Sequence, residues 1–145
     1  MDYLNYINPG IESINPYEPG KSIEEVMEKY NLKEIVKLAS NEKSLGPSPK
    51  VLKVINNFKD IHLYPDGDGI RLKSKISEIE SINSDQIILG NGSNEILEII
   101  SQTFLSPNTE SIFSKHAFVV YKLASKVSVS KIHYVNAHQW GQYLN

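Results

Sequence analysis

The sequence predicts an α/β fold. From residue 86 onward, short apolar runs alternate with stretches whose apolar residues recur at helical spacing, in the order strand, helix, strand, helix, strand. This alternation is typical of strands that are buried on both faces and joined by right-handed crossovers. With 145 residues, 40% of them hydrophobic, the chain is long enough for one modest domain with a packed core.

The N-terminal third predicts an arm, a helix and a strand. Residues 1–20 contain three prolines, two glycines and three tyrosines, which favours an extended arm with aromatic anchors. Ser22 is placed to cap a helix that continues through Tyr30, with Glu25 at the capping-box position. Residues 35–38 predict a short strand.

A turn-rich loop over residues 40–49 leads into the next helix. Ser48 precedes it, Pro49 takes the favoured first position, and its buried side runs to Phe58. Further along, the sequence predicts a polar turn at residues 64–69 and helices at residues 70–81 and 118–127, in addition to the helix after Gly92. It predicts strands at residues 87–89, 111–114 and 131–135.

The segment QIILGNGSNEILEIISQTFL, residues 86–105, is the most informative motif. A short apolar strand runs into a turn containing Gly90 and Gly92, and an amphipathic helix follows, with Ser93 or Asn94 as its cap. Free N–H groups at a helix N-terminus, reached through glycines, form an anion site. The motif lacks both the three-glycine dinucleotide spacing and the lysine of a P-loop. An ordinary strand-to-helix turn is the alternative at this point.

Composition and charge exclude several classes of function. A net charge of −2 argues against nucleic acid as the main partner. The chain has no cysteine, so it has no disulfide and no cysteine-based zinc site, and its four histidines lack paired metal spacing. The N-terminus does not resemble a signal peptide, and no apolar stretch approaches the roughly 20 residues of a membrane span. We therefore expect a soluble, cytoplasmic protein with no metal, nucleic-acid or membrane partner.

Four segments in order resemble histidinol-phosphate aminotransferases, which belong to the fold-type-I enzymes that use pyridoxal 5′-phosphate (PLP). They are VKLASNEKSLGPSPKVL, LYPDGDGIRLKSKIS, ILGNGSNEILEIISQTFL and IFSKHAFVVYKLAS, and NPYEPGKSIEEV resembles the N-terminal arm of the same family. The resemblance implies the N-terminal portion of a fold-type-I transferase: an arm and short helix (1–30), a contribution to the small domain (31–58) and an incomplete α/β/α large domain (59–145).

The resemblance also implies a PLP site. Gly92, Ser93 and Asn94 would hold the cofactor phosphate through backbone N–H groups, with or without the Ser93 hydroxyl. Phe118 falls where this family places an aromatic ring on the cofactor pyridine. Tyr64 resembles the tyrosine that reaches the cofactor phosphate of a neighbouring subunit, which implies a homodimer. The alternative for Gly92, Ser93 and Asn94 is simple capping of the helix, for Phe118 packing in the core, and for Tyr64 a tyrosine that only covers a turn. Tyr121 is expected to be structural.

The substrate side would involve the loop SNEKSLGP and the arm. Asn41 and Glu42 match the family's SNENPLGP loop, whereas Lys43 and Ser44 depart from its usual Asn-Pro. Tyr17 matches an aromatic residue near the imidazole end of the substrate. The implied substrates are histidinol phosphate and 2-oxoglutarate, with imidazole-acetol phosphate and glutamate as the other pair, in histidine biosynthesis.

No catalytic residue of the family falls within the matched segments. The lysine that forms the Schiff base with PLP, the carboxylate on the pyridine nitrogen and the arginine for the substrate phosphate come later in the family's sequence. We therefore expect residues 1–145 alone to lack aminotransferase activity and to dissolve poorly, because apolar strand faces would be uncovered.

Two further interpretations stay open from the sequence. The chain could belong to another fold-type-I PLP enzyme, such as an aromatic aminotransferase or a threonine-phosphate decarboxylase. It could also be a non-catalytic phosphate-binding or dimerisation module.

Overall fold

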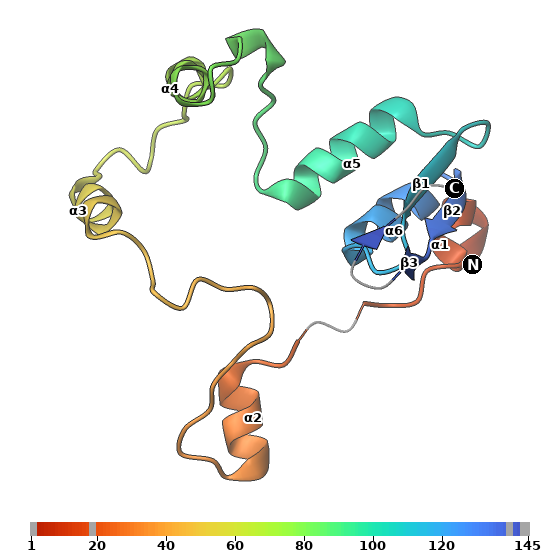
Figure 1. Cartoon of the computed structure of the whole chain (residues 1–145), viewed down its shortest axis with the longest axis horizontal. Coiled ribbons are helices and arrows are strands. Elements are labelled where there is room, and N and C mark those ends of the chain that lie inside the picture. Colours follow the sequence, from red (N-terminus) through yellow and green to blue (C-terminus); the bar gives the residue numbers. More distant parts are fainter. Residues whose placement is uncertain (1–2, 18–19, 139–140, 143–145) are drawn as a thin grey trace. The chain divides into compact units, whose positions relative to one another are not determined.

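The structure, a computed structural model, describes residues 3–17, 20–138 and 141–142, and it divides into two compact units. Unit 1 comprises Met1–Asn15 and Asp68–Asn145, and unit 2 comprises Pro16–Gly67. In unit 1 the chain returns to its own N-terminal segment after more than fifty residues (Figure 1).

The centre of unit 1 is a parallel strand pair joined by a helix. Strand β1 (Glu110–Ser114) pairs with β2 (Lys131–Val135), with Glu110 opposite Lys131 and Ser114 opposite Val135. Helix α6 (Val119–Val127) forms the crossover between them (Figure 1). The predicted strand-helix-strand order from residue 111 to 135 is therefore confirmed, and the two strands run parallel, as a crossover connection between them requires.

Helix α5 (Ser93–Phe104) packs against α6, but the segment before it is not a strand. Ile87 is extended, at φ −109° and ψ 120°, and only 8% exposed, yet residues 87–89 make no ladder with any strand that the structure describes. The prediction of a strand at 87–89 is thus wrong for this structure, because a strand requires a hydrogen-bonded neighbour as well as an apolar run.

Two helical elements precede this segment. Helix α4 spans Ile70–Glu80, and a short 3-10 helix, η2 (Ser84–Gln86), follows it. In η2 the side chain of Asn83 accepts from the N–H of Gln86, while the backbone N–H of Asn83 donates to Gln86 Oε1 at 3.0 Å. This reciprocal pair fixes the direction in which the chain enters the extended segment.

The N-terminal segment is helical rather than extended, so the prediction of a wholly extended arm is wrong. A 3-10 helix, η1 (Tyr3–Tyr6), is followed by the single-turn helix α1 (Pro9–Glu12), whose N-cap is Asn8. Pro9 occupies the first helical position, where its fixed φ favours a helix start and its missing N–H costs nothing. At the other end of the chain, β3 (Ala137–His138) and β4 (Gly141–Gln142) pair antiparallel.

The interior of unit 1 contains serines as well as apolar side chains. Ile87 and Val120 are the buried hydrophobic residues among those described, and four buried serines accompany them: Ser101, Ser114, Ser125 and Ser130. The hydroxyls of Ser101 and Ser128 are 3.0 Å apart, linking α5 to the end of α6. An apolar groove of about 430 Å³ stays open beside them, lined by residues that include Leu97, Ile100, Leu105, Ile112, Phe113 and Tyr121.

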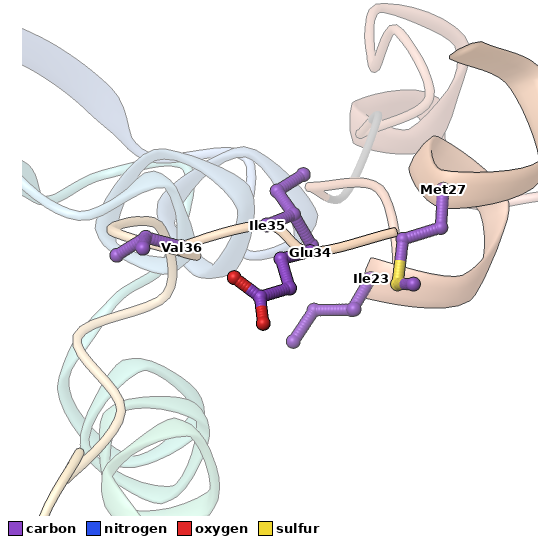
Figure 2. Close-up of a pocket in the computed structure, with 5 residues that line it drawn as sticks. All are labelled: Ile23, Met27, Glu34, Ile35 and Val36. Carbon is purple, nitrogen blue, oxygen red and sulfur yellow. The ribbon is translucent and has the colours of Figure 1, made fainter. Parts of the chain in front are cut away.

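Unit 2 contains helices α2 (Ile23–Tyr30) and α3 (Pro49–Asn57), both where the sequence predicts them. Ser22 Oγ accepts from the N–H of Glu25 at 3.0 Å, which confirms the predicted N-cap. Residues 35–38 form no strand, so that prediction is wrong for the same reason as at 87–89. Instead, Ile23 and Met27 of α2 and the irregular segment 34–36 line a shallow apolar pocket (Figure 2).

Candidate functional site

The candidate phosphate site is the turn that enters α5. The helix begins at Ser93, with Gly92 as its N-cap at φ 90° and ψ 173°. This conformation favours glycine, and no atom lies within 4 Å of the position that a Cβ on Gly92 would occupy. The expected capping by Ser93 or Asn94 is therefore wrong: these residues are the first two of the helix, and their N–H groups have no acceptor within it.

Glu95 and Gly90 define the shape of this turn. The carboxylate of Glu95 accepts from the backbone N–H of Asn91, one helical turn back. A Cβ on Gly90 would lie 2.7 Å from Ile96 Cδ1 and 3.1 Å from Glu95 Oε2, so the turn packs directly on the helix it precedes. The two glycines thus have different roles: Gly92 supplies a backbone conformation and Gly90 a close approach. The sequence motif did not indicate the Glu95 contact.

Phe118 lies at the corresponding end of α6. It is the N-cap residue of that helix and is 51% exposed, directly after the turn that follows β1. Leu97 and Tyr121 line the same groove, as do Ser101 and Ser125 one turn further along each helix. The contact between the hydroxyls of Ser101 and Ser128 joins the C-terminal parts of the two helices, which run in the same direction with their N-termini at the same end of unit 1 (Figure 1).

Tyr121 is structural, as expected. Its ring lies 6.0 Å from that of Phe113 on β1, and Phe113 in turn makes an edge-to-face contact with Tyr134 on β2 at 5.3 Å. Such pairs contribute roughly 0.5–1.5 kcal/mol beyond their buried area. The aromatic cluster holds α6 against the strands, although Tyr121 is still 42% exposed, compared with 51% for Phe118.

The other predicted site residues belong to unit 2. Tyr64 is fully exposed and Tyr17 is 57% exposed. Asn41 and its neighbour Ser40 both have positive φ, 49° and 72°, which gives the loop a tight reversal. The carboxylate of Glu42 pairs with Lys37 Nζ at 2.9 Å. The structure thus groups Gly92, Ser93, Asn94 and Phe118 in unit 1, and the roles of Tyr17, Asn41, Glu42 and Tyr64 stay predictions.

An ionic cluster that the sequence did not indicate joins β1 and β2. Glu110 pairs with Lys131 Nζ at 3.1 Å and with His133 Nε2 at 2.6 Å. The hydrogen bond from Lys131, and next the one from His133, lower the pKa of the Glu110 carboxyl. Within the described residues, no group of three or more His, Cys, Asp or Glu side chains could hold a metal ion, and no helix could cross a membrane.

Comparison with known families decides what kind of protein carries this site. The sequence profile described as aminotransferase class I and II matches residues 33–143. The chain belongs to this family. The match includes the turn at Gly92, both helices that begin at the candidate site, and the parallel strand pair.

Relatives in the aminotransferase family confirm the resemblance seen in the sequence. Histidinol-phosphate aminotransferase 2 of Pseudomonas fluorescens strain Pf-5 is 40% identical over 146 residues, which cover 99% of this chain and 40% of the relative. Histidinol-phosphate aminotransferase 1 of Idiomarina loihiensis is 43% identical over 143 residues, covering 98% and 39%. The chain spans about 40% of the length of these curated relatives.

A solved structure confirms the predicted fold class. The crystal structure of histidinol-phosphate aminotransferase from Sinorhizobium meliloti, in complex with pyridoxal 5′-phosphate, matches 94% of this chain and 36% of its own, with a TM-score of 0.79 and 18% identity. The chain therefore has the fold of one portion of a fold-type-I aminotransferase, an incomplete α/β fold.

Proposed function

We propose that this chain is the N-terminal, phosphate-binding part of a PLP-dependent histidinol-phosphate aminotransferase. The observation that carries the proposal is the turn at Gly92, which leaves the first N–H groups of a twelve-residue helix open beside a positive-φ glycine. The names of the relatives support the substrate: L-histidinol phosphate and 2-oxoglutarate would exchange an amino group, in histidine biosynthesis.

The residues at the start of α5 and α6 fit PLP. The N–H groups of Ser93 and Asn94 would bind the phosphate at the positive end of the helix dipole, and Phe118 would stack on the pyridine ring. When bound, PLP supplies an electron sink for removal of a proton from the amino-bearing carbon of the substrate. The residues described here would bind and orient the cofactor, whereas the lysine that handles the proton belongs to a later segment of the family's sequence.

Four residues of unit 2 would take the roles that the family's motifs imply for them. Asn41, Glu42 and Tyr17 would contact the substrate, and Tyr64 would donate its hydroxyl to the cofactor phosphate of a second copy. The full exposure of Tyr64 supports this role, since a side chain that serves another subunit is not packed in its own. The proposal therefore includes a homodimer that works in the cytoplasm on small-molecule substrates.

One test is genetic. Sequencing beyond the codon for Asn145 should reveal Asp-x-x-Tyr and Ser-x-x-Lys segments followed by an arginine motif. A gene extended in this way should restore growth to a bacterial strain that lacks histidinol-phosphate aminotransferase when histidine is withheld. If the gene instead relieves a requirement for aromatic amino acids or for cobamide precursors, the chain belongs to another fold-type-I enzyme. A stop codon after Asn145 would favour the non-catalytic module.

A second test measures the phosphate site on the purified chain. Pyridoxine 5′-phosphate is the suitable probe, because it lacks the aldehyde through which PLP reacts with surface lysines. We expect calorimetry to show binding of pyridoxine 5′-phosphate and of inorganic phosphate, but not of pyridoxine. If pyridoxine and pyridoxine 5′-phosphate bind with equal affinity, the turn at Gly92 does not bind the phosphate group.

A variant pair locates the donors. Ser93→Pro removes one backbone N–H at a position where proline suits a helix start, as Pro49 shows in α3. Ser93→Ala removes only the hydroxyl. Because a hydrogen bond to a charged group contributes about 1.5–3 kcal/mol, Ser93→Pro should weaken phosphate binding roughly tenfold or more. Ser93→Ala should bind within about threefold of the unaltered chain.

A further inference from the structure

The C-terminal end of α6 is capped from two places in the sequence. The last four carbonyls of a helix lack intrahelical partners. Three of them are satisfied locally, by Ser128 N–H on Ala124 O at 3.1 Å, Ser130 N–H on Ser125 O at 3.2 Å and Val129 N–H on Lys126 O at 2.9 Å. The fourth, Val127 O, accepts from the side-chain amide of Asn8 at 3.0 Å.

Asn8 is held at both ends of its amide. Its oxygen accepts from the N–H of Gly10 at 2.9 Å, so the same side chain caps α1 and bridges to α6. The ammonium of Lys126 donates to the backbone oxygen of Ser13. Gly10 lies so close to α6 that a Cβ there would be 1.9 Å from Lys126 O. Residues 8–13, the docked segment, thus contact the last turn of α6 at three points.

Helix α6 connects this last turn to Phe118. It is nine residues long, so its ends are about 13 Å apart, and a hydrogen-bonded helix of this length moves as one body. If the end of α6 held by Asn8 shifts along the helix axis or rotates, Phe118 at the other end moves with it. Offset stacking of aromatic rings is sensitive to displacements of this kind.

We propose that Asn8 is a positioning residue for Phe118: the docked segment fixes the axial position of α6 at which Phe118 faces the cofactor ring. The proposal rests on the proposed function, because Phe118 needs a ring to stack on. It makes the N-terminal segment a part of the cofactor-binding unit, which agrees with the inclusion of residues 1–15 in unit 1.

The test uses a variant that separates the two bonds of Asn8. Asn8→Ser keeps a side-chain oxygen for the N–H of Gly10, since serine is among the preferred N-cap residues, but it is too short to reach Val127 O. Asn5→Ser makes the same exchange at an exposed position of η1 and is the matched control. Asn8→Asp is the second variant: it keeps the cap and loses the amide donor. Far-ultraviolet circular dichroism establishes that each variant is folded.

Two ligands separate positioning from general destabilisation. Inorganic phosphate reports only on the turn at Gly92, whereas pyridoxine 5′-phosphate reports on that turn and on the stacked ring. We expect Asn8→Ser and Asn8→Asp to weaken binding of pyridoxine 5′-phosphate about fivefold, the value of one aromatic contact, with the affinity for phosphate changed less than twofold. Asn5→Ser should change neither.

Each other outcome overturns the proposal. Equal weakening for both ligands would make Asn8 a purely structural residue, as would failure of both variants to fold. Unchanged affinity for pyridoxine 5′-phosphate would show that Phe118 does not depend on the docked segment. If the unaltered chain binds neither ligand, the phosphate site itself fails, and this result is distinguishable because it precedes any substitution at Asn8.

Discussion

Gly10 lies against the backbone oxygen of Lys126, so close that an added Cβ would approach that oxygen to 1.9 Å. Gly10 is itself buried, although it lies in a four-residue helix near the N-terminus. The contact joins two segments 116 positions apart in the sequence, and no side chain can be accommodated between them without moving one of the backbones.

Gly10→Ala should therefore destabilise unit 1. Displacing a backbone to relieve overpacking costs typically 1–3 kcal/mol, and the free energy of unfolding in urea should fall by about that amount. Gly67→Ala is the control, because nothing lies within 4 Å of its Cβ position. Equal midpoints for the two variants would contradict the close approach of Gly10 to α6.

Val129→Gly should stabilise the chain. Val129 has φ 57° in a helix-ending motif in which Val129 N–H bonds Lys126 O and Ser130 N–H bonds Ser125 O. Glycine is the usual residue at this position, and a left-handed conformation costs other residues about 1–2 kcal/mol. After allowing for the greater flexibility of glycine in the unfolded chain, we expect a gain of about 0.5–1 kcal/mol in urea denaturation. Val127→Gly, at the last residue of the helix, should instead lose roughly a few tenths of a kcal/mol.

Acidification should weaken the link between β1 and β2. The hydrogen bond from Lys131, followed by that from His133, lowers the pKa of Glu110 below its usual value of 4.5. A carboxyl whose pKa is lower in the folded state contributes stability above its unfolded pKa and loses that contribution as the pH falls through its folded pKa. Stability should therefore drop below about pH 4.5.

Glu110→Gln tests this assignment. The variant should be less stable than the unaltered chain at pH 7, and the difference in urea midpoint should vanish at low pH, where both side chains are neutral. Glu28→Gln, on the exposed side of α2, is the control for removal of a negative charge. A Glu110→Gln difference that persists unchanged at pH 3 would contradict a role for the carboxylate charge.

The apolar groove between α5, β1 and α6 should make the isolated chain self-associate. Ile112 in this groove is 61% exposed, and contiguous apolar surface of this kind favours association. Ile112→Lys should reduce the concentration-dependent light scattering of the purified chain. Gln102→Lys adds the same charge on α5 outside the groove lining and should reduce it less. If both substitutions reduce the light scattering equally, the association depends on net charge and not on the groove.

The candidate site was partly predictable because its parts are local. The turn at Gly92, the start of α5 beside it and the start of α6 at Phe118 follow from glycine placement and from helical spacing, which act over a few residues. The Glu95 bond to Asn91 was not predicted, although both residues lie within the same motif. Its geometry depends on the conformation that Gly92 adopts, and composition alone does not specify that conformation.

Capping residues and hydrophobic period act through the backbone of each segment, and they were enough to predict the helices α2, α3, α4, α5 and α6 and the strands β1 and β2. Only the tertiary structure decided that residues 35–38 and 87–89 stay unpaired and that the N-terminal segment caps α6 through Asn8. The physical reason is the same in these cases: a ladder or a distant cap needs a hydrogen-bonding partner from elsewhere in the chain, and local pattern carries no information about where that partner lies.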